Sequence, residues 1–212
     1  MDAAKNINVK STVLYPGISL PAYRQVDAEK QMDPPLIIWN HRWGFDKNCE
    51  IFFEAIRALE DRKIDFRLAL MGENFGKIPD AFKTARKRFK HKILQYGYVS
   101  ERRQYEKWLK RGALVISTAI QENFGISVVE AMLMGCIPLL PYRLSYPEIL
   151  PAAYHEHFLY QNKYDLMEKF FDIMTQYSRY EPLRNRLVEE MESFLWQNVA
   201  AGYDRTLERL AG

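Results

Sequence analysis

The sequence predicts an α/β fold: a doubly wound, Rossmann-like parallel sheet with helices on both faces. Short apolar runs, of which residues 113–117 are an example, are typical of strands buried in a parallel sheet. They alternate along the chain with segments such as 48–60, in which apolar residues recur at helical spacing. Strands and helices that alternate in this way are joined by right-handed crossovers.

The elements are expected in the following order. Residues 1–35 have the composition of a linker, or of a remnant of a preceding domain, with a candidate strand over 9–15. Residues 36–180 are expected to form the sheet domain, and 181–212 a set of C-terminal helices that pack back on the fold. Strands are predicted at 36–40, 66–71, 93–96, 113–117, 137–140 and 158–160. Helices are predicted at 48–60, 79–89, 101–110 with Ser100 as its cap, 124–134, 163–177, 182–196 and 196–210.

Composition sets outer bounds on the function. The net charge of +3 is compatible with anionic ligands but does not demand a nucleic acid. No apolar run reaches the length of a membrane span, and the first residues lack the pattern of a signal peptide. Cys49 and Cys136 fall in a predicted helix and strand, which is typical of reduced core residues. We therefore expect a cytoplasmic protein.

Two carboxylates bracket the loop and helix that follow the strand at 113–117. Glu122 lies in the loop, and Glu130 follows eight residues later, about two turns into the helix. The helix start beside Phe124-Gly125 exposes unpaired backbone N–H groups and the positive end of the helix dipole, where a phosphate binds well. Gly125 lets the backbone approach a ligand closely. The alternative is that Glu122 caps the helix and Glu130 is a solvated surface residue.

A second group of charged residues follows the first predicted strand. Arg42 and Lys47 lie in the loop after residues 36–40, and open α/β sheets bind ligands at the carboxyl ends of their strands. Two cations beside a helix start are unfavourable unless an anion joins them, although they could also be solvated. His41 either lines the same pocket or is a structural loop residue bonded to the backbone. The four histidines show no metal-ligand spacing, so no metal is predicted.

These two motifs together resemble the donor site of retaining glycosyltransferases that have two Rossmann-like domains, the GT-B fold. Such enzymes carry an acidic residue, Phe-Gly and a second acidic residue at the spacing of Glu122 and Glu130, and an Arg and a Lys at the spacing of Arg42 and Lys47. The segments His41-Arg42-Trp43 and Tyr146-Pro147-Glu148-Ile149 narrow the resemblance to the tRNA-queuosine α-mannosyltransferase group, over roughly residues 36–160.

The resemblance implies a function for each matched residue. It implies the C-terminal half of a GT-B fold, with GDP-mannose as donor, a queuosine-bearing tRNA as acceptor, and no metal or other cofactor. Arg42 and Lys47 are expected to hold the diphosphate, Glu122 to contact the transferred sugar near the reacting carbon, and Glu130 to bind the ribose hydroxyls. The expected donor-binding residues are His41, Gly72, Tyr98, Asn123, Phe124, Gly125, Ile126 and Glu130. The N-terminal acceptor-binding domain is expected to be absent from this chain, which alone would be inactive.

Other functions stay open from the sequence. A non-catalytic nucleotide-binding module and a GT-B-fold sugar-nucleotide epimerase would carry similar residues. A basic run at 83–92 includes Arg86, Lys87 and Arg88, which are candidates for contact with the tRNA backbone. The alternative for this run is a solvated helix face, since cations are favourable near the C-terminus of a helix.

Overall fold

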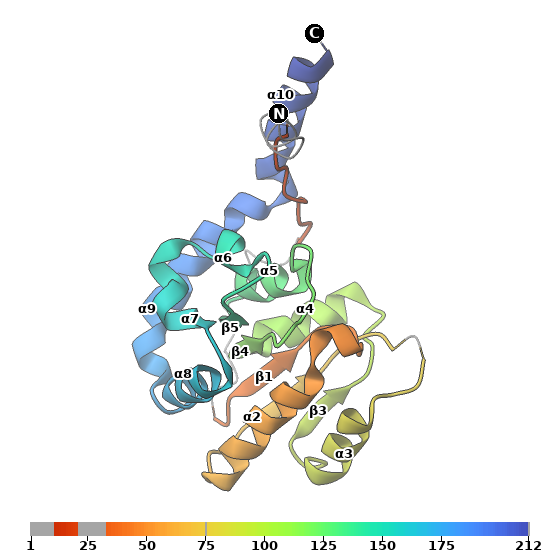
Figure 1. The fold of residues 1–212 in the computed structure, drawn as a ribbon, viewed down its shortest axis with the longest axis vertical. Helices are drawn as coiled ribbons and strands as arrows, with labels where there is room; N and C mark the ends of the chain where they lie inside the picture. The colour runs from red at the N-terminus through yellow and green to blue at the C-terminus, as the bar shows by residue number, and fades with distance from the viewer. Residues whose placement is uncertain (1–10, 21–32, 75, 212) are drawn as a thin grey trace, which may run out of the picture.

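The computed structural model describes residues 11–20, 33–74 and 76–211. Across these ranges, six parallel strands form one sheet in the order β3-β2-β1-β4-β5-β6 (Figure 1). Their bounds are β1 Leu36–Trp39, β2 Arg67–Leu70, β3 Ile93–Tyr96, β4 Leu114–Ile116, β5 Ile137–Pro141 and β6 Leu159–Tyr160. This is the strand order of a doubly wound dinucleotide-binding fold, as the sequence predicts.

Helices cover both faces of the sheet. The longer ones are α2 Cys49–Asp61, α3 Asp80–Arg88, α4 Arg102–Arg111, α5 Ile126–Leu133, α8 Lys163–Thr175, α9 Tyr177–Met191 and α10 Trp196–Ala211. The shorter ones are η2 Phe45–Lys47, α6 Tyr146–Ile149, η3 Ala152–Tyr154, α7 His155–Phe158 and η4 Glu192–Phe194. Because right-handed crossovers run in opposite directions from β1, α2 and α3 lie together on one face and α4 and α5 on the other.

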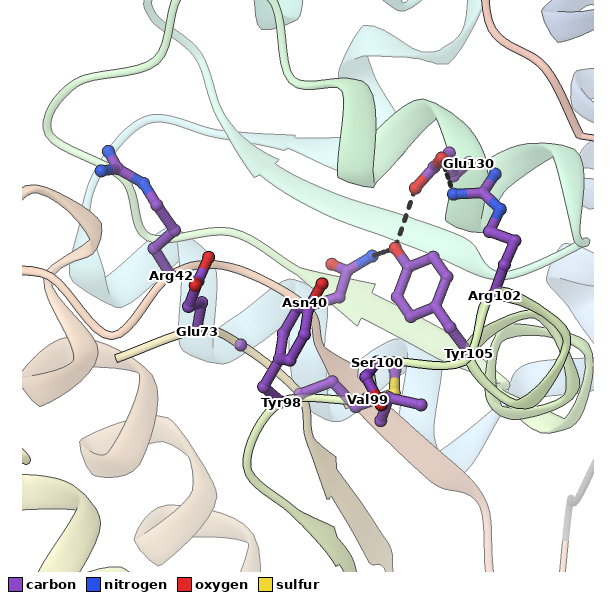
Figure 2. Close-up of a pocket in the computed structure, with 11 residues that line it drawn as sticks. Asn40, Arg42, Glu73, Tyr98, Val99, Ser100, Arg102, Tyr105 and Glu130 are labelled. Carbon is purple, nitrogen blue, oxygen red and sulfur yellow. Dashed lines mark hydrogen bonds and ion pairs between the residues drawn. The ribbon is translucent and has the colours of Figure 1, made fainter. Parts of the chain in front are cut away.

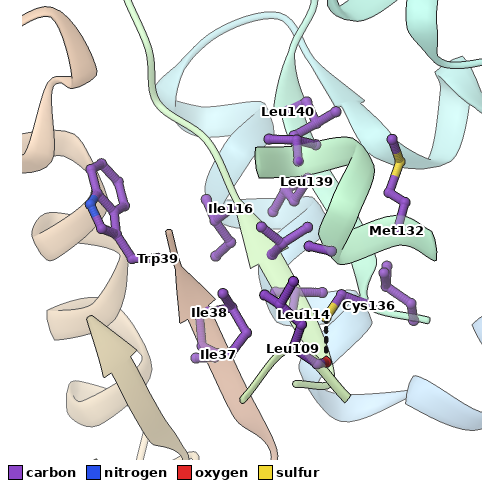
Figure 3. Close-up of a cluster of buried hydrophobic side chains, with 14 of the residues drawn as sticks. Ile37, Ile38, Trp39, Leu109, Leu114, Ile116, Met132, Cys136, Leu139 and Leu140 are labelled. Carbon is purple, nitrogen blue, oxygen red and sulfur yellow. Dashed lines mark hydrogen bonds between the residues drawn. The ribbon is translucent and has the colours of Figure 1, made fainter. Parts of the chain in front are cut away.

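The core lies between these layers. All four residues of β1 are fully buried, since helices shield the central strands on both sides. Figure 3 shows Ile38 of β1, Leu114 of β4 and Met132 of α5 among the buried side chains of this core. Burying a side chain of this kind stabilises the fold by about 1.5–3 kcal/mol. The sheet is therefore a rigid platform for the loops at its edges.

The segments before and after the sheet domain are hydrogen-bonded to each other. Ile18 forms a parallel bridge with Leu195, so residues 16–20 run beside the segment between α9 and α10. Helix α9 packs on α5, whereas α10 extends away from the sheet and none of its residues 196–211 is buried (Figure 1). Tyr203 of α10 donates a hydrogen bond to the carbonyl oxygen of Tyr15 (2.9 Å). No helix of the described residues is both long and apolar enough to cross a membrane.

Several predicted boundaries were wrong, each for a physical reason. Of the strand predicted at 9–15, residues 9 and 10 lie outside the described ranges and 11–15 are not a strand; the segment pairs farther along, where Ile18 bridges to Leu195. The helix predicted from 124 begins at Ile126, because Gly125 adopts a left-handed conformation with φ of 96°. Ser100 does not cap α4, whose N-cap residue is Glu101.

The largest error concerns the start of α9. The sequence places Pro182 at the beginning of this helix, yet α9 begins at Tyr177 and contains the proline in its interior. Tyr180 is buried, and Tyr177 donates a hydrogen bond to the carbonyl oxygen of Ala113 (3.3 Å). This packing keeps the first turn of α9 helical against the sheet domain, which outweighs the local cost of the proline. Near β6, residues 155–158 form α7 and leave a strand of only two residues.

Candidate active site

The candidate site lies at the carboxyl ends of β1 and β4, the point at which the strand order reverses and where such sheets bind ligands. Two loops, 40–48 and 117–125, follow these strands and are bonded to each other. The hydroxyl of Thr118 donates to the carbonyl oxygens of Lys47 (2.9 Å) and Asn48 (2.8 Å). The amide of Ile120 donates to the carbonyl oxygen of Asp46 (2.8 Å). The two loops therefore act as one rigid unit.

The structure brings Lys47, Arg42 and Glu122 together, as the sequence predicts. Lys47 is buried, and its Nζ donates to the carbonyl oxygen of Gln121 (2.7 Å) and to Oε2 of Glu122 (3.1 Å). Asp46 lies 3.2 Å from Lys47 Nζ and also pairs with Arg42 (3.2 Å). The Arg42 side chain is 59% exposed and free to turn toward a ligand. Lys47 is fixed, whereas Arg42 is adaptable.

The start of α5 faces the same place. No side chain of the described residues caps this helix, and its N-cap residue is the left-handed Gly125. A side chain at this position would be strained, since L-residues rarely adopt such a backbone conformation. Gly125 and Ile126 line a cavity of about 490 Å³ together with Asn40, His41, Arg42, Lys47, Glu122, Asn123, Phe124 and Ser127. This cavity combines two cations with the positive end of a helix, which suits a diphosphate.

Neither of the alternative explanations for the two glutamates holds. Glu122 does not cap α5: its Oε2 pairs with Lys47, and its Oε1 accepts a hydrogen bond from the amide of Asn123 (3.1 Å). Glu130 is not a solvated surface residue, because only 7% of it is exposed. Both carboxylates are held in defined positions at the site.

A second cavity, of about 310 Å³, adjoins the first and shares Asn40 and Arg42 with it (Figure 2). Its other lining residues are Met71, Gly72, Glu73, Tyr98, Val99, Ser100, Arg102, Tyr105 and Glu130. Tyr98 is 63% exposed on the wall of this cavity, so its ring is available to a flat ligand. The two cavities therefore lie side by side, with Tyr98 in the wall of one and Glu122 in the wall of the other.

Glu130 is held by residues that the sequence did not single out. Its Oε1 pairs with Arg102 Nη1 (2.8 Å), and its Oε2 accepts a hydrogen bond from the Tyr105 hydroxyl (2.9 Å), as the dashed lines in Figure 2 show. Asn40 Nδ2 donates to the same hydroxyl (3.0 Å) and to the carbonyl oxygen of Ser127 (2.7 Å). A signal did exist, because Arg102 and Tyr105 are three residues apart on a helix that follows a predicted ligand-binding loop.

His41 combines the two functions that the sequence left open. Its imidazole is buried, and Nε2 lies 3.3 Å from the carbonyl oxygen of Ile116, so this nitrogen carries the proton. The residue also lines the 490 Å³ cavity. Burial lowers the pKa of His41 to about 4, although the carboxylate of Glu122 raises it. The ring is therefore neutral near pH 7 and is both a structural residue and a wall of the cavity.

Phe124 anchors loop 117–125 to the outer segments of the chain. Its ring is 8% exposed and packs against Tyr15 (centroids 5.6 Å apart) and Phe194 (5.4 Å). Asn123 and Ile126, by contrast, are exposed at the rim of the cavity. Of the predicted donor-binding residues, Phe124 is thus the one that joins the loop to the two outer segments of the chain.

Gly72 lines the second cavity and also lies close to the backbone of His41. A Cβ atom at this position would lie 1.9 Å from the carbonyl oxygen of His41 and 2.8 Å from the ring of Trp43. Close approach of the neighbouring backbone thus accounts for the glycine. The predicted approach of a nucleotide to Gly72 stays a prediction.

We expect Gly72→Ala to lower the free energy of unfolding by about 1–3 kcal/mol, because the loop carrying His41 must move. Gly76→Ala is the matched control, since a Cβ there would have no atom within 4 Å. The control should change stability by less than about 0.5 kcal/mol. Urea unfolding of the three proteins measures both effects. Equal midpoints for Gly72→Ala and the unmodified chain would contradict the close approach.

The basic run at 83–92 lies apart from both cavities. Neither cavity is lined by Arg86, Lys87 or Arg88. Lys87 is exposed, whereas other cations of the run have partners within the chain. Lys83 pairs with Asp80, Arg86 lies over the ring of Tyr96, Arg88 pairs with Glu60 and Asp61, and Lys92 pairs with Asp65. Much of the positive charge in this run is therefore compensated.

Comparison with known proteins decides the family. Residues 24–193, about four fifths of the chain, match the family described as glycosyl transferases group 1. The chain belongs to the group 1 glycosyltransferases. A tRNA-queuosine alpha-mannosyltransferase of Drosophila melanogaster is 39% identical over 115 residues, which make up 54% of this chain and 30% of that protein. This glycosyltransferase chain thus matches less than a third of the length of that relative.

Solved structures show the same fold for this glycosyltransferase. A glycosyltransferase from Rickettsia africae superimposes with a TM-score of 0.75 at 15% identity, over 98% of this chain and 61% of that chain. The C-terminal domain of the group 1 family protein LpcC from Francisella tularensis gives a TM-score of 0.63 at 17% identity, over 85% of this chain and 95% of that domain. The pneumococcal O-GlcNAc transferase GtfA, in complex with UDP and GlcNAc, gives 0.71 at 14% identity, over 86% and 36% of the two chains.

Proposed function

We propose that this glycosyltransferase domain binds GDP-mannose and that, within the full-length protein, it transfers mannose to queuosine in tRNA with retention at the anomeric carbon. The observation that carries the proposal is the pair of adjoining cavities, one with Glu130 and the other with Lys47 and Glu122. The name of the Drosophila relative supports mannose as the transferred sugar and queuosine in tRNA as the acceptor.

The donor extends through both cavities in this proposal. The nucleoside occupies the cavity beside Tyr98, whose exposed ring stacks on the base, and Glu130 accepts hydrogen bonds from the ribose hydroxyls. The diphosphate lies between Arg42, Lys47 and the start of α5, which supply charge-assisted and backbone hydrogen bonds. The sugar then reaches the end of the cavity lined by His41 and Glu122.

Transfer breaks the bond between the anomeric carbon and the diphosphate oxygen. The acceptor hydroxyl forms the new bond on the face that the diphosphate leaves, and its proton passes to the departing phosphate oxygen. Negative charge grows on the diphosphate in this step, and in this proposal it is stabilised by Lys47, by the α5 N-terminus and by Arg42 once it has turned toward the ligand. The proposal needs no metal for this purpose. Glu122 orients the sugar hydroxyls and is not a nucleophile here.

Calorimetry with GDP, UDP and ADP on the purified chain tests the choice of donor. We expect GDP to bind more tightly than the other two nucleotides. Preference for UDP or ADP would overturn the assignment of GDP-mannose. Binding without transfer by the full-length protein would favour a nucleotide-binding module, and isomerisation of a sugar nucleotide without acceptor would favour an epimerase.

We also propose that the basic run on α3 contacts the tRNA backbone in the full-length protein. Changing Arg86, Lys87 and Arg88 together to Glu should weaken tRNA binding and flatten its salt dependence, because fewer counterions are released. The log–log slope should fall by about 0.9 for each phosphate contact that is lost. Filter binding across a salt series measures the slope. An unchanged slope and affinity would leave the run as a solvated surface, and GDP affinity serves as the control.

A further inference from the structure

Glu130 is held by two side chains of α4, and we infer that Arg102 and Tyr105 are positioning residues that aim the Glu130 carboxylate at both ribose hydroxyls of the donor. This inference rests on the proposed function, which places the ribose at Glu130. It adds a specific arrangement of acceptors, and hence a preference for ribonucleotides. It also assigns a function to α4, which carries both positioning residues.

The inference follows from the number of hydrogen-bond acceptor sites on the Glu130 carboxylate. An ionised carboxylate has two oxygens and about four lone-pair sites. Arg102 Nη1 occupies one site on Oε1 (2.8 Å), and the Tyr105 hydroxyl occupies one site on Oε2 (2.9 Å). One site remains on each oxygen, and the group lines the 310 Å³ cavity. Two acceptors on one carboxylate match the two neighbouring hydroxyls of a ribose.

Arg102 is the cation that pairs with the Glu130 carboxylate. Glu130 is buried, and a buried carboxylate is costly unless a cation pairs with it. Burial opposes the charge of Arg102, but the carboxylates of Glu130 and Glu106 outweigh this effect and raise the pKa of Arg102. Arg102 also donates to Glu106 (3.0 Å) and to the carbonyl oxygen of Ser19 (3.0 Å), so its guanidinium is held at three places.

Tyr105 keeps the direction of its hydrogen bond. Burial and the nearby Glu130 raise the pKa of Tyr105 well above its usual value, so the hydroxyl keeps its proton. Asn40 Nδ2 donates to the same hydroxyl (3.0 Å), and the single O–H of Tyr105 is therefore left to donate to Glu130. The orientation of Asn40 is itself fixed, because Nδ2 also donates to the carbonyl oxygen of Ser127 (2.7 Å), which can only accept.

The test compares GDP with its 2′,3′-dideoxy analogue by calorimetry on the purified chain. The unmodified chain should bind GDP about 10- to 100-fold more tightly than the analogue, the range expected for hydrogen bonds to a charged group. Arg102→Met and Tyr105→Phe should each reduce this preference, by about tenfold for Arg102→Met, while affinity for the analogue stays within about twofold. Arg102→Lys should restore part of the preference, because it returns the positive charge.

A double variant separates positioning from direct contact. In a Glu130→Gln background, Arg102→Met should cause no further loss of preference, since both residues act through one carboxylate. Arg103→Met, an exposed neighbour on α4, is the matched control and should bind as the unmodified chain does. Thermal melting shows which variants remain folded. The ratio of the affinities for GDP and for the analogue is compared only among folded proteins.

The outcomes distinguish the inference from the proposed function. If Arg102→Met weakens GDP and the analogue equally, Arg102 contacts another part of the ligand and the inference is wrong. If Tyr105→Phe and Arg102→Met both keep the full preference, Glu130 needs neither of them and the inference is again wrong. If the unmodified chain binds GDP and the analogue equally, the ribose is not at Glu130. This outcome contradicts the proposed arrangement of the donor itself, whatever the variants show.

Discussion

Replacing Lys47 with methionine is expected to lower the kcat of the proposed mannosyl transfer about 100- to 1000-fold in the full-length protein, the usual effect of removing one preorganised donor from a developing charge. The Nζ of Lys47 lies at the junction of three acidic or carbonyl oxygens and lines the cavity assigned to the diphosphate. Methionine keeps most of the volume but removes the charge. It also leaves Glu122 without its cation, so the carboxylate proposed to orient the sugar loses its ion pair.

Initial rates with GDP-mannose and tRNA measure this effect. The matched control is Lys107→Met, because Lys107 is an exposed lysine that lines neither cavity. Its kcat should match that of the unmodified protein. A Lys47→Met protein that melts normally and keeps kcat within about threefold would show that Lys47 does not act in the transfer step.

Acidification is expected to destabilise the chain through His41. The folded-state pKa of His41 is about 4, below the ordinary value of 6.5. Between these two values the unfolded chain binds a proton that the folded chain does not, so stability falls as the pH is lowered. From pH 7 to pH 4.5 the loss due to this one residue is about 2–3 kcal/mol. Above about pH 7.5 the residue contributes almost no pH dependence, because it is then neutral in both states.

His41→Gln isolates this contribution from those of other groups. Glutamine can still donate to the carbonyl oxygen of Ile116 but does not titrate. The free energy of unfolding should therefore fall by about 2–3 kcal/mol less in the variant than in the unmodified chain over the same pH range. Urea unfolding at pH 7 and pH 4.5 measures both proteins. Parallel losses would mean that His41 takes up a proton in the folded state.

The residues that could be predicted from the sequence are those placed by strand order. Arg42 and Lys47 follow β1, Glu122 follows β4, and the carboxyl ends of parallel strands meet at one edge of the sheet. Their proximity can therefore be predicted without knowledge of side-chain packing. The fold class follows from the same alternation of apolar strands and amphipathic helices, and the structure confirms it.

The parts that escaped prediction depend on contacts between distant segments. Tyr105 meets Asn40 and Glu130 only because α4 and α5 pack side by side on one face. The charge of Arg88 is compensated by Glu60, which lies 28 residues away and on another helix. Pro182 is tolerated inside α9 because Tyr180 is buried on the same helix. Local propensity carries no information about such partners.

The packing of the Phe124 ring against Tyr15 and Phe194 should couple two equilibria. One is the binding of a ligand to the loop that carries Phe124, and the other is the docking of the two outer segments behind that loop. A ligand that favours the docked arrangement must itself be bound more tightly when the segments are docked, by the same factor. A change in the docking of either segment should therefore change the ligand affinity of the loop, and a bound ligand should in turn stabilise the contact between Tyr15 and Phe194.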